Sequence, residues 1–144
     1  MKNLIMLLPL LLVTEAFAGG FADWFGSCGG KDNNFCQAKV VRTYDGDTFY
    51  VNIEKVHSLF GAELGIRIKG IDTPEMRGGT PETKALAVKA RDFTIKFLAE
   101  AKRVDLKDCV RGKFFRIVCE VYGDKDKSLA EELLKAGLAK VYAE

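Results

Sequence analysis

Two short acidic motifs and one arginine are the residues of this sequence best suited to chemistry. The first motif is Asp45-Gly46-Asp47-Thr48, and the second runs from Ile71 to Glu75, shortly after Arg67. Carboxylate oxygens without a nearby histidine or thiolate favour a hard cation, calcium or magnesium. A guanidinium beside them can bind phosphate oxygens in pairs. The combination predicts a metal-assisted reaction at a phosphodiester.

Each motif alone has an ordinary structural explanation. Asp45-Gly46 is a common hairpin turn, and Asp72-Thr73-Pro74 is a common strand end, because proline stops the hydrogen-bond ladder. Together they are more informative, since both fall at the ends of strands that a small barrel would bring together. Two close carboxylates are costly unless one is protonated or a cation lies between them. We therefore expect Asp47 and Asp72 to converge on one ion, with water completing its shell.

The elements that would position these motifs follow from local patterns. Alternating apolar residues predict a hairpin from Ala38 to Ile53 that turns at Asp45-Gly46, and then a third strand from Leu64 to Gly70. Thr80-Pro81 predicts the start of a helix that reaches about Ala101. Its expected buried stripe consists of apolar residues at helical spacing. These residues are Leu86, Ala90, Phe93, Phe97 and Ala101.

The C-terminal third predicts two more strands and a second helix. The strands span residues 103–109 and 115–122. A capping box at Ser128–Glu131 opens the helix, Gly137 ends it, and residues 139–142 could add an extended piece. Five strands with a long helix between the third and fourth predict an α+β fold, mainly β, of the five-stranded OB-fold β-barrel type.

Three stretches of this sequence resemble the staphylococcal (micrococcal) nuclease family. They are Asp45–Thr48, Arg67–Glu75 and Glu131–Val141, and the likeness extends from about Ala38 to Val141. Found together in this order, these motifs are specific. The resemblance implies a calcium-dependent endonuclease that hydrolyses DNA and RNA and leaves 3′-phosphate ends.

The resemblance also assigns roles to the acidic residues. Asp47 and Asp72 would be carboxylate ligands of calcium, and Thr73 would contribute its backbone carbonyl. Asp45 would be an outer-shell acid close to the metal. Glu75 resembles the family's proposed general base, which orients or deprotonates the attacking water.

Two arginines complete the catalytic set that the resemblance implies. Arg67 would grip the phosphate and stabilise the transition state. Either Arg111 or Arg116 could be the second arginine, and Arg116 keeps the family's interval to the strand-end tyrosine, here Tyr122. Arg111 is then a surface charge or a contact to the nucleic-acid backbone.

The segment before Arg116 departs from the family. Phe114-Phe115 stands where the family often has Tyr-Gly, so the phenolic hydroxyl is lost while base stacking can survive. We expect Lys113 and Phe114 to contact nucleic acid.

The N-terminus predicts export. Residues 1–18 have the charged, apolar and small-residue regions of a signal peptide, and the apolar run is shorter than the roughly 20 residues of a membrane span. Residues 19–37 would form an irregular arm and residues 38–144 the nuclease domain. The expected location is the periplasm or the medium.

Four cysteines in an exported chain predict disulfides. Of the three possible connectivities we favour the local pairs, Cys28 with Cys36 and Cys109 with Cys119. Zinc is the disfavoured alternative, because there is no Cys-x-x-Cys motif and His57 is the only histidine.

Composition limits the possible partners. The net charge is +2, so nucleic-acid affinity would need a local cluster of basic residues. We expect a monomer that takes DNA and RNA as substrates. Two alternatives stay open: a nucleic-acid-binding OB module without catalysis, and a secreted binding domain whose acidic turns are only turns.

Overall fold

The computed structural model describes residues 33–54 and 56–142. The predicted signal peptide, most of the predicted arm and Cys28 lie outside these residues. None of the described helices is long and apolar enough to cross a bilayer.

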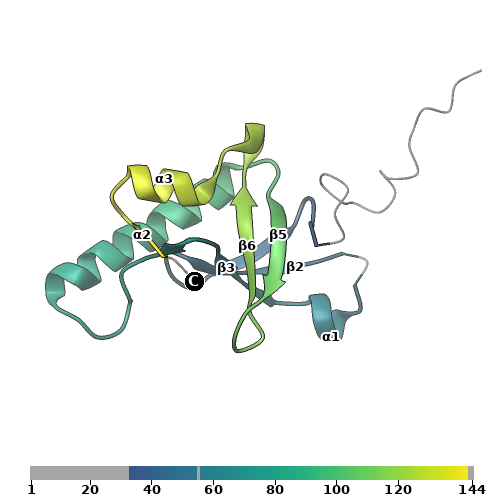
Figure 1. Cartoon of the computed structure of the whole chain (residues 1–144), viewed down its shortest axis with the longest axis horizontal. Coiled ribbons are helices and arrows are strands. Elements are labelled where there is room, and N and C mark those ends of the chain that lie inside the picture. Colours follow the sequence, from purple (N-terminus) through teal and green to yellow (C-terminus); the bar gives the residue numbers. More distant parts are fainter. Residues whose placement is uncertain (1–32, 55, 143–144) are drawn as a thin grey trace, which may run out of the picture.

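The main sheet has five strands in the order β1-β2-β3-β6-β5. The strands are β1 (Lys39–Thr43), β2 (Thr48–Asn52), β3 (Leu64–Ile68), β5 (Asp105–Arg111) and β6 (Ile117–Tyr122). β1, β2 and β3 form an antiparallel meander, β6 runs parallel to β3, and β5 pairs antiparallel with β6 (Figure 1). The predicted hairpin, third strand and later strand pair are confirmed within a few residues.

A second, two-stranded sheet joins β4 (Ile71–Asp72) to β7 (Lys140–Val141). β7 is the extended piece expected near the C-terminus. Its pairing with β4 places Lys140 opposite Asp72. This pairing brings the end of the chain back to the second acidic motif.

The predicted mixture of a five-stranded sheet and helices is confirmed, but the main sheet is not closed. Its strand order leaves β1 and β5 at the edges. Backbone hydrogen bonds join Phe35 to Leu106 of β5 and the Ala38 N–H to the Val104 carbonyl, at 2.7 to 2.9 Å. The segment before β1 therefore lies along β5 without forming a continuous ladder with it.

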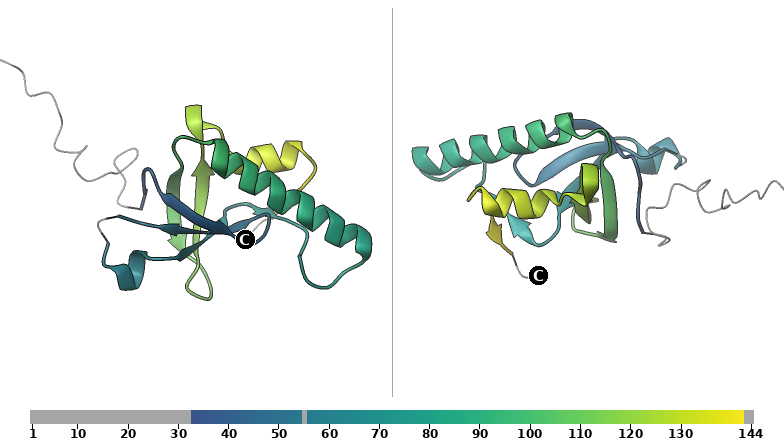
Figure 2. Two further views of the ribbon diagram at one scale, coloured as in Figure 1. Left: turned by 180° about the vertical axis from the view of Figure 1, so that it is seen from behind. Right: turned by 90° about the horizontal axis from the view of Figure 1, so that it is seen from above.

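The helices are α1 (Ser58–Gly61), α2 (Pro81–Glu100) and α3 (Leu129–Lys135), and a short 3-10 turn, η2 (Asp124–Asp126), precedes α3. Thr80 and Ser128 cap α2 and α3 as predicted, since each hydroxyl accepts a hydrogen bond from the backbone three residues on. Gly137 has a φ of +67°, as the predicted C-terminal stop requires. Figure 2 shows α2 and α3 side by side at one end of the molecule and α1 at the opposite end.

The predicted buried stripe of α2 is wrong in part. The helix buries Ala87, Ala90, Thr94 and Leu98, whereas Leu86 is 41% exposed. Phe93, Phe97 and Ala101 are only partly buried against the core. The difference arises because small residues let α2 approach the β1–β2 turn closely, and that contact fixes which face turns inward.

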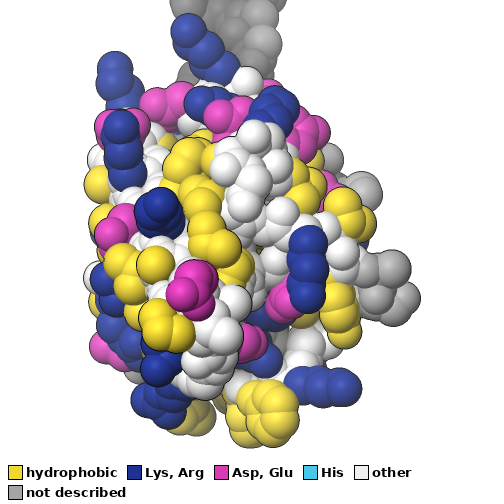
Figure 3. Space-filling model, turned by 90° about the vertical axis from the view of Figure 1, so that its left-hand side faces the viewer, with side chains coloured by type: hydrophobic (Ala, Val, Ile, Leu, Met, Phe, Trp, Pro, Cys, Tyr) yellow, Lys and Arg dark blue, Asp and Glu magenta, His cyan; other side chains and the backbone are white. Residues whose placement is uncertain are grey.

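The core lies between the main sheet and the two longer helices. Its largest fully buried side chains come from β2, β3, β4, β5 and α3. They include Phe49, Ile66, Ile68, Ile71, Leu106, Leu129 and Leu133. On the end of the molecule that carries α2 and α3, basic and acidic side chains are interspersed (Figure 3).

Cys109 of β5 and Cys119 of β6 form a disulfide, which confirms one predicted pair. The other predicted pair stays a prediction, because Cys28 is outside the described residues.

Candidate active site

The turn between β1 and β2 carries the first acidic motif. The Ile68 N–H donates a 2.9 Å hydrogen bond to the Asp47 carbonyl, and Thr48 pairs with Arg67 in the β2–β3 register. The turn is thereby fastened to the end of β3. Asp47 is buried, with 2% of its surface exposed.

Helix α2 supports the same turn from the other side. The buried Thr94 hydroxyl donates a 2.7 Å hydrogen bond to the Gly46 carbonyl. A Cβ on Gly46 would lie 2.7 Å from the Ala90 Cβ and 2.9 Å from the Thr73 side chain. Glycine is needed here for space, because the turn, α2 and the second acidic motif meet at this point.

The Asp47 carboxylate has four hydrogen-bond donors around it. Its Oδ1 accepts from the Arg67 guanidinium at 2.7 Å and from the Thr48 hydroxyl at 3.0 Å. Its Oδ2 accepts from the Thr73 N–H at 3.0 Å and the Thr73 hydroxyl at 3.1 Å. These bonds hold a buried charge in one orientation and join the two acidic motifs.

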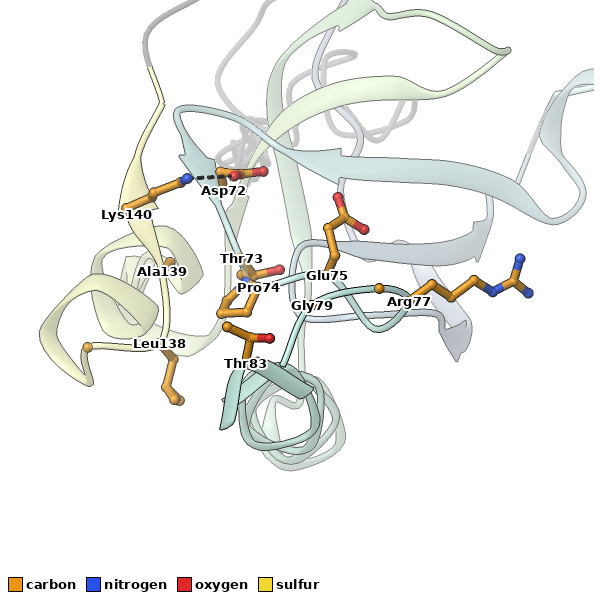
Figure 4. Close-up of a pocket in the computed structure, with 12 residues that line it drawn as sticks. Asp72, Thr73, Pro74, Glu75, Arg77, Gly79, Thr83, Leu138, Ala139 and Lys140 are labelled. Carbon is orange, nitrogen blue, oxygen red and sulfur yellow. Dashed lines mark ion pairs between the residues drawn. The ribbon is translucent and has the colours of Figure 1, made fainter. Parts of the chain in front are cut away.

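Arg67 binds both predicted carboxylate ligands at once. Its Nη1 pairs with Asp47, and its Nη2 pairs with Asp72 Oδ1 at 3.0 Å. Lys140 of β7 lies 3.4 Å from Asp72 Oδ2 (Figure 4). The structure therefore brings Asp47, Arg67, Asp72 and Thr73 together, with one guanidinium between two acids.

Asp45 lies at the edge of this cluster. Its Oδ1 accepts a 3.2 Å hydrogen bond from the Asp47 N–H. Burial, together with the nearby negative charge of Asp47, raises the pKa of Asp45 to about 6. Excess negative charge is what a cation beside the cluster would relieve.

The side chains of Glu75 and Arg116 form no hydrogen bond or ion pair with this cluster. Glu75 is exposed, and it forms no hydrogen bond or ion pair with residues 33–54 or 56–142. It follows Thr73-Pro74 along one side of a pocket, and its carboxylate points away from Leu138 (Figure 4). Arg116 precedes β6, and its Cγ lies over Gly65, two residues before Arg67 on β3.

The residues predicted to contact nucleic acid lie around the β5–β6 hairpin. Arg111 ends β5, and Lys113 and Phe114 belong to the turn. All three are exposed. They line or border a groove that also includes Arg116 and whose lining does not include Asp47 or Asp72.

The donor chemistry fits a hard cation. The described residues contain no group of three or more His, Cys, Asp or Glu side chains at metal-ligand spacing. Asp47, Asp72 and the Thr73 carbonyl would thus need water oxygens to complete a shell. The Thr48 and Thr73 hydroxyls can rotate away, which would free lone pairs of the Asp47 carboxylate to bind a cation. A site with oxygen ligands and few protein groups suits calcium.

Comparisons with known proteins agree with these motifs. A family model described as "Staphylococcal nuclease homologue" matches residues 65–144. The chain belongs to the staphylococcal nuclease family.

Individual relatives of this family match over different lengths. The thermonuclease of Staphylococcus hyicus is 30% identical over 117 residues, which cover 81% of this chain and 65% of that protein. A probable endonuclease of Phaeosphaeria nodorum is 35% identical over 83 residues, 56% of this chain and 28% of its own length. The chain therefore spans less than two thirds of either relative.

Sequence reasoning did not identify three residues that the structure adds to this cluster and its support. Thr48 and Thr94 donate the hydroxyl bonds described above, and Lys140 pairs with Asp72. One face of α2 carries short side chains at Ala87, Ala90 and Thr94. This pattern in the sequence was a signal that the helix approaches a neighbouring turn closely. Nothing local marks Lys140, because its role depends on the long-range β4–β7 pairing.

Proposed function

We propose that this protein is a calcium-dependent endonuclease that hydrolyses phosphodiester bonds of DNA and RNA. The observation that supports this most directly is the bridging of Asp47 and Asp72 by Arg67. A secreted binding domain with ordinary acidic turns gives no reason for a buried carboxylate, a second acid and a guanidinium to share one network.

Asp47, Asp72 and the Thr73 carbonyl would hold the calcium ion. When bound, calcium supplies positive charge to the phosphoryl oxygens and favours attack by water. Asp45 adds negative charge behind the ligands without needing to touch the ion.

Arg67 is suited to bind the scissile phosphate because its guanidinium already lies between the two acids. A phosphate would compete with Asp72 for this guanidinium, and the planar fork binds two phosphate oxygens as readily as carboxylates. Charge that builds on those oxygens in the transition state would then be neutralised.

Glu75 would accept the proton of the attacking water or orient that water. It is exposed and free of described partners, so a carboxylate is available for this task. Water adds to phosphorus, the bond to the 5′ oxygen breaks, and the products are a 3′-phosphate and a 5′-hydroxyl. Arg116 would contact the phosphate and assist the leaving oxygen.

A digestion assay tests this function. Single-stranded DNA, duplex DNA and RNA are incubated with the protein in calcium or in a chelator, and end-labelled products are resolved by gel. We expect cleavage in calcium, essentially none in chelator, and 3′-phosphate ends.

Glu75→Ala separates catalysis from binding. It should lower turnover by about 10²-fold or more, the range of a lost general base. Glu100→Ala, which removes another exposed acid at the end of α2, is the matched control and should keep full activity. A wild-type protein that binds nucleic acid but cuts none of the three substrates would favour the binding-module alternative.

We also propose that the protein is exported. Sequencing of the N-terminus after expression in a bacterial host should give Gly19 as the first residue. Recovery of the intact Met1 form in the cytoplasm would contradict this proposal.

A further inference from the structure

Residues of α1 and of the β5–β6 hairpin line one groove. Figure 1 shows both elements on the lower side of the molecule, with α1 at the end opposite α2 and α3. The groove lining combines exposed aromatic side chains with arginines. The members used below are Tyr50, Phe60, Arg111, Phe114, Phe115 and Arg116.

The hairpin turn holds two phenylalanines in a backbone conformation that is unfavourable for bulky side chains. The Arg116 N–H donates to the Lys113 carbonyl at 3.2 Å, so Phe114 and Phe115 are the central residues of the turn. Their φ angles are +57° and +59°, the type I′ geometry that favours Asn-Gly. Each side chain is 84% exposed. Bulky apolar groups in a left-handed turn stabilise nothing inside the molecule, and such outliers gather at functional sites.

The opposite wall of the groove is equally apolar and firmly held. Leu59 and Phe60 of α1 are 77% and 66% exposed. The Ile53 N–H donates a 2.8 Å hydrogen bond to the Gly61 carbonyl, and a Cβ on Gly61 would lie only 2.9 Å from the Ile53 oxygen. α1 is therefore docked against the end of β2 and presents Phe60 from a fixed position.

The charges of the groove suit an anion. Arg111 and Arg116 form no ion pair with any described residue. Glu63, the acid in the lining, lies 3.8 Å from Arg42, whose guanidinium stacks 3.6 Å from the Tyr50 ring centre. The unpaired cations and the aromatic faces together match a phosphate backbone that carries exposed bases.

The groove shares strand β3 with the candidate active site, because Leu64 and Gly65 of this strand line it and Arg67 follows on the same strand. Arg116 crosses Gly65, and Gly65 lies two residues from Arg67 on β3. We propose that this groove holds the unpaired bases of a nucleic-acid strand beyond the scissile phosphate, stacked on Phe60 and on Phe115 with Phe114. This inference rests on the proposed nuclease function. Paired bases in a duplex hide their faces, so the occupant is single-stranded DNA or RNA.

Binding in a chelator tests the groove without requiring catalysis. Fluorescence anisotropy is measured with a labelled single-stranded oligothymidine and with a duplex of the same length. Phe60→Ala and Phe115→Gly should each weaken single-strand binding by about 5- to 100-fold and duplex binding much less. Leu86→Ala removes an apolar side chain from α2 that is 41% exposed and lies outside the groove lining, and it should leave both affinities unchanged.

Phe115→Gly also separates function from structure. Glycine suits the positive φ, so this variant should melt at a higher temperature than the wild type while it binds the single strand less well. A purely structural role of Phe115 predicts that melting temperature and affinity fall together.

The outcomes distinguish the groove from the nuclease proposal. Normal single-strand affinity in both variants would overturn the proposed role of the groove, even if the wild type cuts nucleic acid in calcium. A wild-type dimer in sedimentation that Phe60→Ala dissociates would also overturn it, because the groove would then be a self-association surface. Weakened binding in both variants supports the groove even if no cleavage is found.

Discussion

Arg67 is the side chain on which the acidic cluster depends. Asp47 has a side chain only 3% exposed, and Arg67 supplies its ionic partner. Removing one member of a buried ion pair leaves an uncompensated charge, which costs about 3–5 kcal/mol. Arg67→Ala should therefore lower the free energy of unfolding in chelator by an amount of that order and lower turnover in calcium by orders of magnitude.

Lysine at the same position separates charge from geometry. Arg67→Lys should keep more stability than Arg67→Ala, because one positive charge remains, but it cannot bridge two carboxylates or a phosphate. Lys140→Ala is the control, since Lys140 is 78% exposed and its pair with Asp72 contributes at most about 1 kcal/mol. Urea unfolding and digestion assays measure the two effects. Full turnover in Arg67→Lys would reject the proposed phosphate contact.

Asp45 should make the metal-free protein more stable as the solution becomes mildly acidic. Its pKa is raised to about 6 in the folded protein, from an ordinary value of 3.8. The folded state then binds a proton that the unfolded chain does not bind between pH 6 and 4. The contribution of Asp45 to the free energy of unfolding therefore rises as pH falls through 6.

Asp45→Asn isolates this contribution, because asparagine carries no charge at any pH. In chelator, the variant should be more stable than the wild type at pH 7, and this advantage should shrink by pH 5. Melting temperatures of both proteins at the two pH values measure the difference. A constant difference across this interval would show that Asp45 does not titrate there.

The sequence was sufficient to single out Asp47, Arg67 and Asp72, which the structure brings together, but not the neutral groups that orient them. Carboxylates and guanidiniums at strand ends stand out by type and spacing. A threonine such as Thr94 looks like any residue of a helix until the tertiary structure shows which carbonyl it meets. The metal-binding and catalytic roles of all these residues stay predictions, and among the described residues the side chains of Glu75 and Arg116 form no hydrogen bond or ion pair with the cluster.

Helix α2 should determine the position of the first acidic motif through Thr94. Thr94→Val keeps the shape of the side chain but removes the 2.7 Å hydrogen bond to the Gly46 carbonyl. A buried acceptor left without a donor costs about 1–3 kcal/mol. We expect a loss of stability in this range and weaker calcium binding, measured by urea unfolding and calorimetry.

Thr83→Val is the matched control on the same helix. Its hydroxyl donates a 2.9 Å hydrogen bond to the exposed Thr80 carbonyl, which water can replace. The change in stability should stay below about 0.5 kcal/mol, as for surface substitutions in general. Equal losses in the two variants would argue against a specific link between α2 and the turn.

Elements with strong local signals were predicted well. Caps at Thr80 and Ser128 fixed the starts of both longer helices, and Asp45-Gly46 fixed the first hairpin. The inward face of α2 was misjudged at Leu86, because the pattern of large apolar residues ignores the close contact with Gly46. The four-residue helix α1 escaped prediction, since its length is too short for any periodicity.

The whole molecule arranges its chemistry around β3. Arg67 lies on this strand, the first motif is fastened to its end at Ile68, and β4 follows it directly. Parallel pairing with β6 brings Arg116, distant in sequence, beside Gly65. Local patterns cannot reveal this parallel pairing. The candidate site and the groove therefore depend on the β5–β6 hairpin staying in register with β3.

The Cys109–Cys119 disulfide should be a main support of the β5–β6 hairpin. It joins β5 to β6 across a separation of 10 residues, beside the register shift between Lys107 and Val110. A cross-link that closes a loop of this length stabilises a domain by roughly 2–3 kcal/mol, mainly by constraining the unfolded chain. The paired variant Cys109→Ala with Cys119→Ala should melt about 10 °C below the wild type.

Reductant separates this bridge from the other predicted pair. Any further loss of melting temperature when the paired variant is reduced belongs to the predicted bridge between Cys28 and Cys36. Because the loop between Cys109 and Cys119 contains Arg111, Phe114 and Arg116, the paired variant should also bind single-stranded oligonucleotide less well. Unchanged melting and binding would mean that strand pairing alone holds the hairpin against β3.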